Sequence, residues 1–295
     1  LGIEAADGAI RLSYWDNDYL EVTVRKKIKG PASKDKLKSL LDNISFKVEN
    51  LAYEIKLKVE ISEDIKPLFR GIADIELKVP GKLKIINIRS GTGKITMTGF
   101  EELNSADFRL DKGNIEISGC KANDIYVKAS EGDIELNGIE CSGEYECGRG
   151  NIRLRDIKGN IRLKLTAGEG LIEGAEGKLD CDISAGRLII KDSKLMADTV
   201  LYASTGNIEA DLSKIEPSGK YTIKSASGSI YLNLPENAGW SIIAESTKGR
   251  VKNNTGLDEN VLKKSPSGEI YGDFGGGGPM IDAYTDRGNI ILDIT

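Results

Sequence analysis

Glutamates recur at one position of a short glycine-containing motif, and carboxylates in such a pattern could support acid–base chemistry. Glu116, Glu135 and Glu209 each follow a glycine by three residues. A polysaccharide-cleaving enzyme made of stacked strands would combine such carboxylates with Ca²⁺ and basic residues on one face. The same position in other copies of the motif holds residues of different chemistry: Arg153, Ile189, Tyr231 and Lys252. We therefore expect a solvated surface of mixed charge there rather than a catalytic face.

Other residue types that carry chemistry are scarce. The chain has no histidine, which removes the commonest general acid–base group and the commonest metal ligand. No Cys-x-x-Cys pair, and so no standard zinc or redox motif, occurs among the four cysteines: Cys120, Cys141, Cys147 and Cys181. Residues 272–280 are glycine-rich and suggest a phosphate-binding loop, but no Lys-Ser/Thr pair follows them. We expect neither a metal nor a cofactor, and we interpret the loop as a flexible segment suited to partner contact.

Composition and charge exclude several classes of protein. The 295 residues include 34 glycines and only 6% aromatic residues, which suits a fold of many tight turns and thin aliphatic layers. The net charge of -5 comes from interspersed charges without a basic stripe, so we expect no nucleic-acid partner. No run of about eighteen apolar residues occurs, so we expect no transmembrane segment in this chain. Because residue 1 is Leu1 rather than Met, a signal or anchor segment could precede it.

A five-residue motif, G-N-I-x-Φ with Φ apolar, repeats along the chain, and consecutive copies lie 18 to 22 residues apart. A longer gap holds a degenerate copy around Gly168 and Gly170. We expect the motif glycines to be structural turn residues with positive φ: Gly93, Gly113, Gly132, Gly150, Gly186, Gly206, Gly228, Gly249 and Gly288. Asparagines beside them tolerate turn conformations and could form hydrogen bonds along a stack of repeats: Asn114, Asn151, Asn207 and Asn289.

Apolar and polar residues alternate on both sides of each glycine. Around Gly113, for example, the apolar positions hold Phe108, Ile115 and Ile117. This period of two predicts two half-buried strands joined at the glycine. One such unit cannot bury its apolar face alone, but stacked units can, with parallel pairing between successive coils.

The cysteines fall in register with the apolar positions, so we interpret them as small buried hydrophobic residues. A disulfide between Cys120 and Cys141 is the alternative, because these two would occupy adjacent coils near one corner. Such a bond requires Cα atoms within about 7 Å of each other.

The sequence predicts an all-β fold: a right-handed parallel β-solenoid of about ten coils, each of 18–22 residues, with a β-rich N-terminal cap. The cap covers residues 1–82 and carries one short helix near 33–44, with Ser33 as a candidate N-cap. A cap is expected because a bare solenoid end exposes pairing groups. The repeats cover residues 83–295, with an irregular insertion near 253–280. Within the cap, the segment that begins at Gly8 resembles one repeat unit.

These residues resemble a widespread bacterial and archaeal family. The resemblance rests on the repeated G-[ND]-I-x-[LI] units, the Val79-Pro80 step into the repeats, and the segment Thr285-Asp-Arg-Gly-Asn-Ile after a glycine-rich stretch. Members of the family are domains of unknown function with β-strand repeats, labelled as candidate adhesins. The resemblance implies a role at the cell surface or envelope, and it brings no catalytic residues. Related members are often tethered to membranes by other segments.

We therefore expect a non-enzymatic structural, adhesive or binding scaffold, at the cell surface or envelope rather than in the cytoplasm. Its partner would be an unknown protein or carbohydrate surface. One alternative is an enzyme acting on a polysaccharide, which requires three or more carboxylates and a Lys or Arg converging in one groove. The other is a self-associating filament, which an exposed last coil ending at residues 290–294 would favour.

Overall fold

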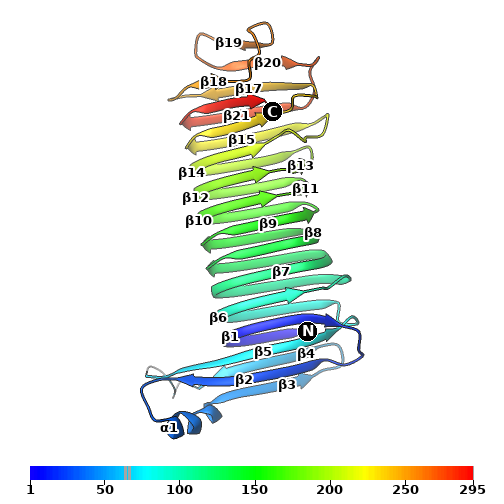
Figure 1. The fold of residues 1–295 in the computed structure, drawn as a ribbon, viewed down its shortest axis with the longest axis vertical. Helices are drawn as coiled ribbons and strands as arrows, with labels where there is room; N and C mark the ends of the chain where they lie inside the picture. The colour runs from blue at the N-terminus through cyan, green and yellow to red at the C-terminus, as the bar shows by residue number, and fades with distance from the viewer. Residues whose placement is uncertain (63–64, 66–67, 295) are drawn as a thin grey trace. The chain divides into compact units, whose positions relative to one another are not determined.

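The computed structural model describes residues 1–62, 65 and 68–294, and the chain divides into two compact units, Leu1–Glu135 and Leu136–Thr295. Both units consist mainly of β-strands, and most strand pairs are parallel (Figure 1). Among the described residues there is one short α-helix, α1 (Lys34–Ser39). The prediction of an all-β, largely parallel fold with one short helix is confirmed.

The first unit is built around three strands that pair in parallel: β1 (Gly2–Trp15), β6 (Ile85–Thr98) and β7 (Leu103–Glu131). Their registers align the motif glycines, with Gly8 opposite Gly93 and Gly93 opposite Gly113. The segment that begins at Gly8 therefore forms a coil in register with the repeats, although the chain passes through residues 16–84 before it reaches the next coil.

Strands β4 (Ile55–Ile61) and β5 (Arg70–Pro80), which belong to the segment between β1 and β6, cover the side of β1 that faces away from β6. Both pair with β1 in parallel. Two further strands, β2 (Glu21–Lys29) and β3 (Ile44–Asn50), then pair antiparallel with β5 and β4. These antiparallel strands cover a coil edge that would otherwise expose its pairing groups.

Helix α1 and the 3₁₀ turn η1 (Leu41–Asn43) connect β2 to β3. The Ser33 hydroxyl accepts a hydrogen bond from the Lys36 amide at 3.4 Å, so Ser33 is the N-cap. No residue of α1 is buried. The helix therefore joins two cap strands and adds nothing to the core.

The second unit repeats the parallel pairing coil after coil. Strand β10 pairs with β12 so that Gly168 lies opposite Gly186, and β12 pairs with β14 so that Gly186 lies opposite Gly206. Gly168 thus fills the glycine position of the degenerate copy. The strands of this stack are β8 (Ile134–Arg149), β9 (Ile152–Lys158), β10 (Ile161–Glu173), β11 (Glu176–Gly177), β12 (Leu179–Lys191), β13 (Lys194–Leu195), β14 (Thr199–Asp211), β15 (Lys220–Ser227) and β16 (Ile230–Leu234).

The last coil in the sequence is an inner coil of the second unit. Strands β21 (Met280–Arg287) and β22 (Ile290–Ile294) pair on one side with β15 and β16. On the other side they pair with β17 (Trp240–Ser246) and β18 (Val251–Asn253). The exposed last coil that would favour a filament is therefore not present at residues 290–294, because β22 already has two partners.

The insertion before this coil folds back as two antiparallel strands. Strand β20 (Ile270–Phe274) pairs with β17, and β19 (Leu262–Lys264) pairs with β20. The two units therefore end their repeats in a similar way. In each, one coil pairs with strands on both of its sides (β1 in the first unit, β21 and β22 in the second), and antiparallel strands then pair with the strands beyond that coil.

The core consists of the predicted inward positions. Side chains five residues before the motif glycine are fully or almost fully buried: Ile88, Phe108, Val127, Tyr145, Cys181, Leu201, Ile223, Ala244 and Ala283. Side chains two residues after it are also buried: Ile95, Ile115, Ile134, Ile152, Leu188, Ile208, Ile230, Val251 and Ile290. Removal of these aliphatic side chains from water is the main favourable term for folding.

A column of glycines permits this stacking. Gly186 has φ of +134°, which side-chain-bearing residues rarely adopt. A Cβ atom at Gly186 would lie 1.8 Å from the carbonyl oxygen of Gly168 in the preceding coil. Only glycine lets the two backbones approach to pairing distance at this corner.

We predict that Gly186→Ala destabilises the protein by about 3 kcal/mol or more, because the added methyl group overlaps backbone that cannot move without breaking strand pairing. Gly276→Ala is the matched control: Gly276 also has positive φ (+86°), but a Cβ there meets no atom within 4 Å. That variant should lose about 1–2 kcal/mol. Urea unfolding followed by circular dichroism measures both, and equal losses would show that backbone conformation, not stacking, selects the glycine.

Candidate functional site

The nine predicted turn glycines form columns and do not converge on a cavity. Eight have φ between +128° and +158°, whereas φ of Gly249 lies outside the positive region. A Cβ at Gly249 would still overlap the carbonyl oxygen of Gly288, at 1.8 Å. In the first unit lie Gly93, Gly113 and Gly132; in the second lie Gly150, Gly186, Gly206, Gly228, Gly249 and Gly288. Their geometry serves stacking and offers no chemistry to a ligand.

The asparagines beside the glycines bond from coil to coil, as predicted. Asn207 Oδ1 accepts a hydrogen bond from the Ser229 amide at 2.8 Å, and Asn289 Oδ1 accepts one from the Arg250 amide at 3.1 Å. Asn114 and Asn151 bond in the same way to the amides of Asp133 and Glu169. Each side chain therefore provides an acceptor for a backbone donor of the adjacent coil at the corner, where the strand ladder is interrupted.

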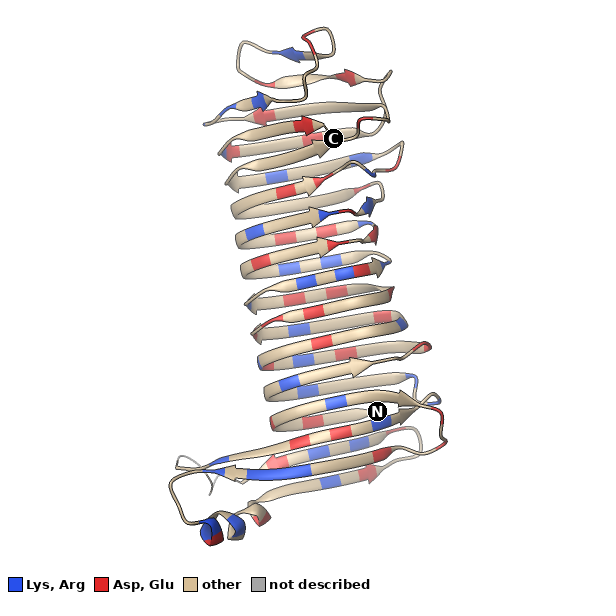
Figure 2. Ribbon diagram, viewed as in Figure 1, with Lys and Arg blue, Asp and Glu red and all other residues tan. Residues whose placement is uncertain are grey.

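Two of the three glutamates that suggested acid–base chemistry, Glu116 and Glu209, belong to ion pairs between coils. Glu116 lies 2.5 Å from Lys94 Nζ, and Glu209 pairs with Arg187. The hydrogen bond with Glu209 raises the pKa of Arg187. Figure 2 shows basic and acidic residues interspersed along the coils of both units. This arrangement matches the expected surface of mixed charge.

All four cysteines are buried, and the structure describes none of them in a disulfide. Burial raises the pKa of both the Cys181 and the Cys120 thiols, because a thiolate would lose its hydration. Cys141 Sγ lies 3.9 Å from the Tyr145 hydroxyl, and burial raises the pKa of that phenol well above its usual value. The interpretation as small buried core residues is confirmed, and the Cys120–Cys141 bond is not formed.

The glycine-rich loop at residues 272–280 is a tight connection between β20 and β21. Gly275, Gly276 and Gly277 all have positive φ, and the Gly277 amide donates to the carbonyl of Phe274 at 3.0 Å. Phe274 stacks on Trp240 with 5.3 Å between ring centroids. The loop thus joins two strands, β20 and β21, that both pair with β17.

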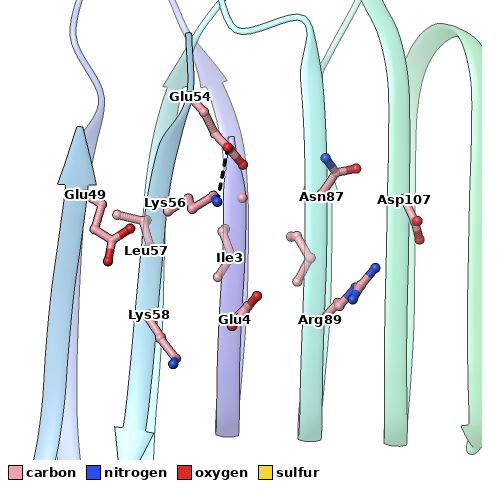
Figure 3. A pocket seen from close by; sticks show the side chains of 12 residues that line it. Ile3, Glu4, Glu49, Glu54, Lys56, Leu57, Lys58, Asn87, Arg89 and Asp107 are labelled. Atoms are coloured by element: carbon pink, nitrogen blue, oxygen red, sulfur yellow. Dashed lines mark ion pairs between the residues drawn. The ribbon is translucent and has the colours of Figure 1, made fainter. Parts of the chain in front are cut away.

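A recess on the first unit was not anticipated from the sequence. Its volume is about 640 Å³, and it lies across β4, β1, β6 and the start of β7. Gly2 lines the recess and lies between Lys56 on one neighbouring strand and Asn87 on the other. Figure 3 shows Glu54 and Lys56 at one wall, where they form an ion pair of 3.4 Å. The missing side chain at Gly2 opens the recess.

A row of charged residues crosses this recess. Strand register places Lys58 beside Glu4, Glu4 beside Arg89, and Arg89 beside Arg109. Lys58, Glu4 and Arg89, labelled in Figure 3, also line an adjoining recess of about 550 Å³ that the figure does not draw. A hydrogen bond from Lys58 to Glu60 raises the pKa of Lys58 and lowers that of Glu60.

Arg109, the last residue of this row, is held in place by two neighbours. The Arg109 guanidinium pairs with Asp107 at 2.9 Å and lies 5.1 Å from the ring centroid of Tyr126. We name this surface, defined by Gly2, Glu4, Lys58, Arg89 and Asp107, the charged groove. Its donors and acceptors suit hydrogen bonding to a polar ligand. No local sequence signal indicates it, because β1 and β4 meet only through the topology of the cap.

Within the described ranges, no three His, Cys, Asp or Glu side chains lie close enough together to hold a metal ion. Among the helices that the structure describes, none is long and apolar enough to cross a bilayer.

The stacked parallel strands, glycine columns and asparagine bonds define an all-β repeat protein. The chain belongs to the Toastrack DUF4097 family, whose model matches residues 1–293. This family has no established function, in agreement with the resemblance seen in the sequence.

A solved structure with similarity to this chain is a candidate cell adhesion protein from Clostridium sporogenes ATCC 15579. It is 12% identical, the match covers 100% of this chain and 92% of that chain, and the TM-score is 0.21. No curated protein matches the chain.

We predict that Asn207→Ala destabilises the protein by about 0.5–1.5 kcal/mol, because the Ser229 amide loses its side-chain acceptor at an exposed corner. Asn207→Asp keeps an oxygen at the same place and should lose less. Urea unfolding compares the two, and hydrogen exchange reports the Ser229 amide directly. Equal exchange of this amide in Asn207→Ala and the parent chain would contradict the role of the side chain.

We also predict that the four thiols react slowly with an aromatic disulfide reagent in the native protein, because all four are buried and burial raises the pKa of Cys120 and Cys181. All four should react in concentrated guanidinium chloride without a reductant. Fewer reactive thiols after unfolding would reveal a disulfide and contradict the structure.

Proposed function

We propose that this chain is a non-enzymatic adhesive or binding scaffold at the cell surface or envelope, built as a right-handed solenoid of about ten coils. The observation that carries the proposal is the pairing of the outward glutamates. Glu116 with Lys94, and Glu209 with Arg187, are tied across neighbouring coils. A glycoside hydrolase uses two carboxyl groups that flank the bond to be cleaved, whereas each of these glutamates is paired with a basic side chain of a neighbouring coil.

The same pairing recurs along the surface. Further ion pairs join neighbouring coils or strands: Lys84 with Glu102, Lys112 with Glu131, Arg155 with Glu173, Arg162 with Asp180, and Lys194 with Glu176. Exposed pairs of this kind contribute little free energy each, about 0–1 kcal/mol. They do maintain a surface covered with fixed donors and acceptors, which suits recognition of a protein or carbohydrate surface.

The charged groove supports a binding role in the first unit. It combines donors on Arg89 and Lys58 with acceptors on Glu4 and Asp107, spread over four strands. Because paired strands hold these groups, a ligand would meet a preorganised site and lose little affinity to ordering of the protein.

Incubation of the chain with a panel of polysaccharides tests the absence of catalysis. We expect no new reducing ends over the background of a heat-unfolded sample. The variant Glu116→Gln/Glu135→Gln serves as a matched control and should behave like the parent chain. Release of reducing ends by the parent chain, and its loss in this variant, would establish the enzyme instead.

Labelling of intact source cells with an antibody against the chain tests the location. We expect labelling without permeabilisation, and loss of the signal after external protease. A signal that appears only after cell lysis, in the fraction that contains cytoplasmic enzymes, would contradict the surface role.

A further inference from the structure

Tyr14 lies near the end of β1, where the chain leaves its coil, and 44% of the residue is exposed. Its ring contacts Phe100 edge to face, with 6.3 Å between centroids and an angle of 79° between planes. Phe100 is itself buried at 2% exposure. The contact therefore holds a surface tyrosine ring against a fixed core residue.

Gly81 keeps the space beside this ring clear. A Cβ atom at Gly81 would lie 3.1 Å from Cε2 of Tyr14, so a side chain there would press against the ring. Tyr14 and Gly81 together line two recesses of about 340 and 350 Å³. The first also contains Trp15, and the second contains Phe100.

Trp15 and Tyr19 are held by a second set of contacts. The Trp15 indole donates a hydrogen bond to the carbonyl of Tyr19 at 2.9 Å, and the two rings meet edge to face at 4.7 Å. The Lys78 ammonium lies 5.1 Å from the indole centroid. Tyr19 is 59% exposed. Three ordered aromatic side chains thus gather at the surface of a chain with only 6% aromatic residues.

The loop between β1 and β2 adds hydrogen-bonding groups to the same place. Asp16, Asn17 and Asp18 line the recess beside Trp15, and their side chains are exposed. In the part of the chain that the structure describes, these three side chains make no hydrogen bond or ion pair. This contrasts with coil-face carboxylates such as Glu116 and Glu209, which form ion pairs. The oxygens of the loop can accept hydrogen bonds, and the Asn17 amide can also donate.

We infer that this aromatic corner, defined by Tyr14, Trp15, Tyr19 and Gly81, binds a neutral glycan. A sugar ring presents an apolar C–H face that packs on aromatic side chains, and hydroxyl groups that bond carboxylates and amides. Carboxylates outnumber ammonium groups around the two recesses and would repel an acidic sugar: Asp16, Asp18, Glu101 and Glu102 against Lys82 and Lys84. The inference rests on the proposed binding function and names its ligand class.

Tryptophan fluorescence reports binding at this corner. The chain has two tryptophans, and Trp240 is fully buried in the second unit, stacked on Phe274. The full chain is titrated with cellohexaose, maltohexaose and chitohexaose, and with an anionic hexagalacturonate. We expect at least one neutral hexasaccharide to change the emission to saturation, and Trp15→Phe to abolish that change while calorimetry still detects binding.

Substitution of Tyr14 tests stacking. Tyr14→Ala should weaken binding roughly tenfold or more, and Tyr14→Phe should keep most of the affinity. Tyr19→Ala, which lies outside the strands, provides a second loss-of-ring variant should Tyr14→Ala fail to fold. Tyr271→Ala removes an equally exposed tyrosine of the second unit and should bind like the parent chain.

The inference is overturned if no neutral hexasaccharide binds, if hexagalacturonate binds in preference, or if the two ring-deleted variants bind as tightly as the parent chain. If both ring-deleted variants still bind the glycan as tightly as the parent chain, the glycan binds elsewhere on the protein, and the proposed adhesive function is not contradicted. Corner-dependent glycan binding in a protein that intact cells never display would instead remove the surface role and leave this site standing.

Discussion

The tightest constraint on this fold is the short distance between the backbones of successive coils at the glycine column. Gly186 lies so near the Gly168 carbonyl that no Cβ fits, and the same holds for Gly206 above Gly186. This proximity lets strands on both sides of the corner pair in parallel without a break. Successive coils pair directly at strand spacing, and their inward positions hold mainly aliphatic side chains.

The asparagine that follows a motif glycine provides a hydrogen-bond acceptor at the corner where the chain bends. The corner interrupts the regular ladder, and an amide of the adjacent coil would lack an acceptor. Asn207 provides that acceptor to Ser229, and Asn289 provides it to Arg250. Outward ion pairs act on the same register: Arg155 with Glu173 and Arg162 with Asp180 join residues that face each other only when the glycines are aligned. Steric fit, corner bonding and charge thus specify one register.

The repeats could be predicted from the sequence because each depends on residues close together in the chain. Alternation around Gly113 identified the buried Phe108 and Ile115, and the asparagines were recognised as bonding groups. The order of coils in space could not be predicted. Pairing of residues 2–13 with β6, and insertion of β21 between β15 and β17, depend on which distant edge the chain meets. The charged groove was missed for the same reason, since its rows combine strands from distant parts of the sequence.

Interruptions of the repeat, rather than the repeat itself, produce the recesses of the first unit. Where coil follows coil, an outward charge such as Glu116 already has a partner one coil away. The charged groove forms where β4 returns to pair with β1 beside Gly2. The aromatic corner forms where β1 ends and the chain departs. Groups without an internal partner, such as Asp16, occur at these places. A ligand that contacts these excursions would distinguish this protein from another stack of similar coils, because the excursions do not recur along the stack.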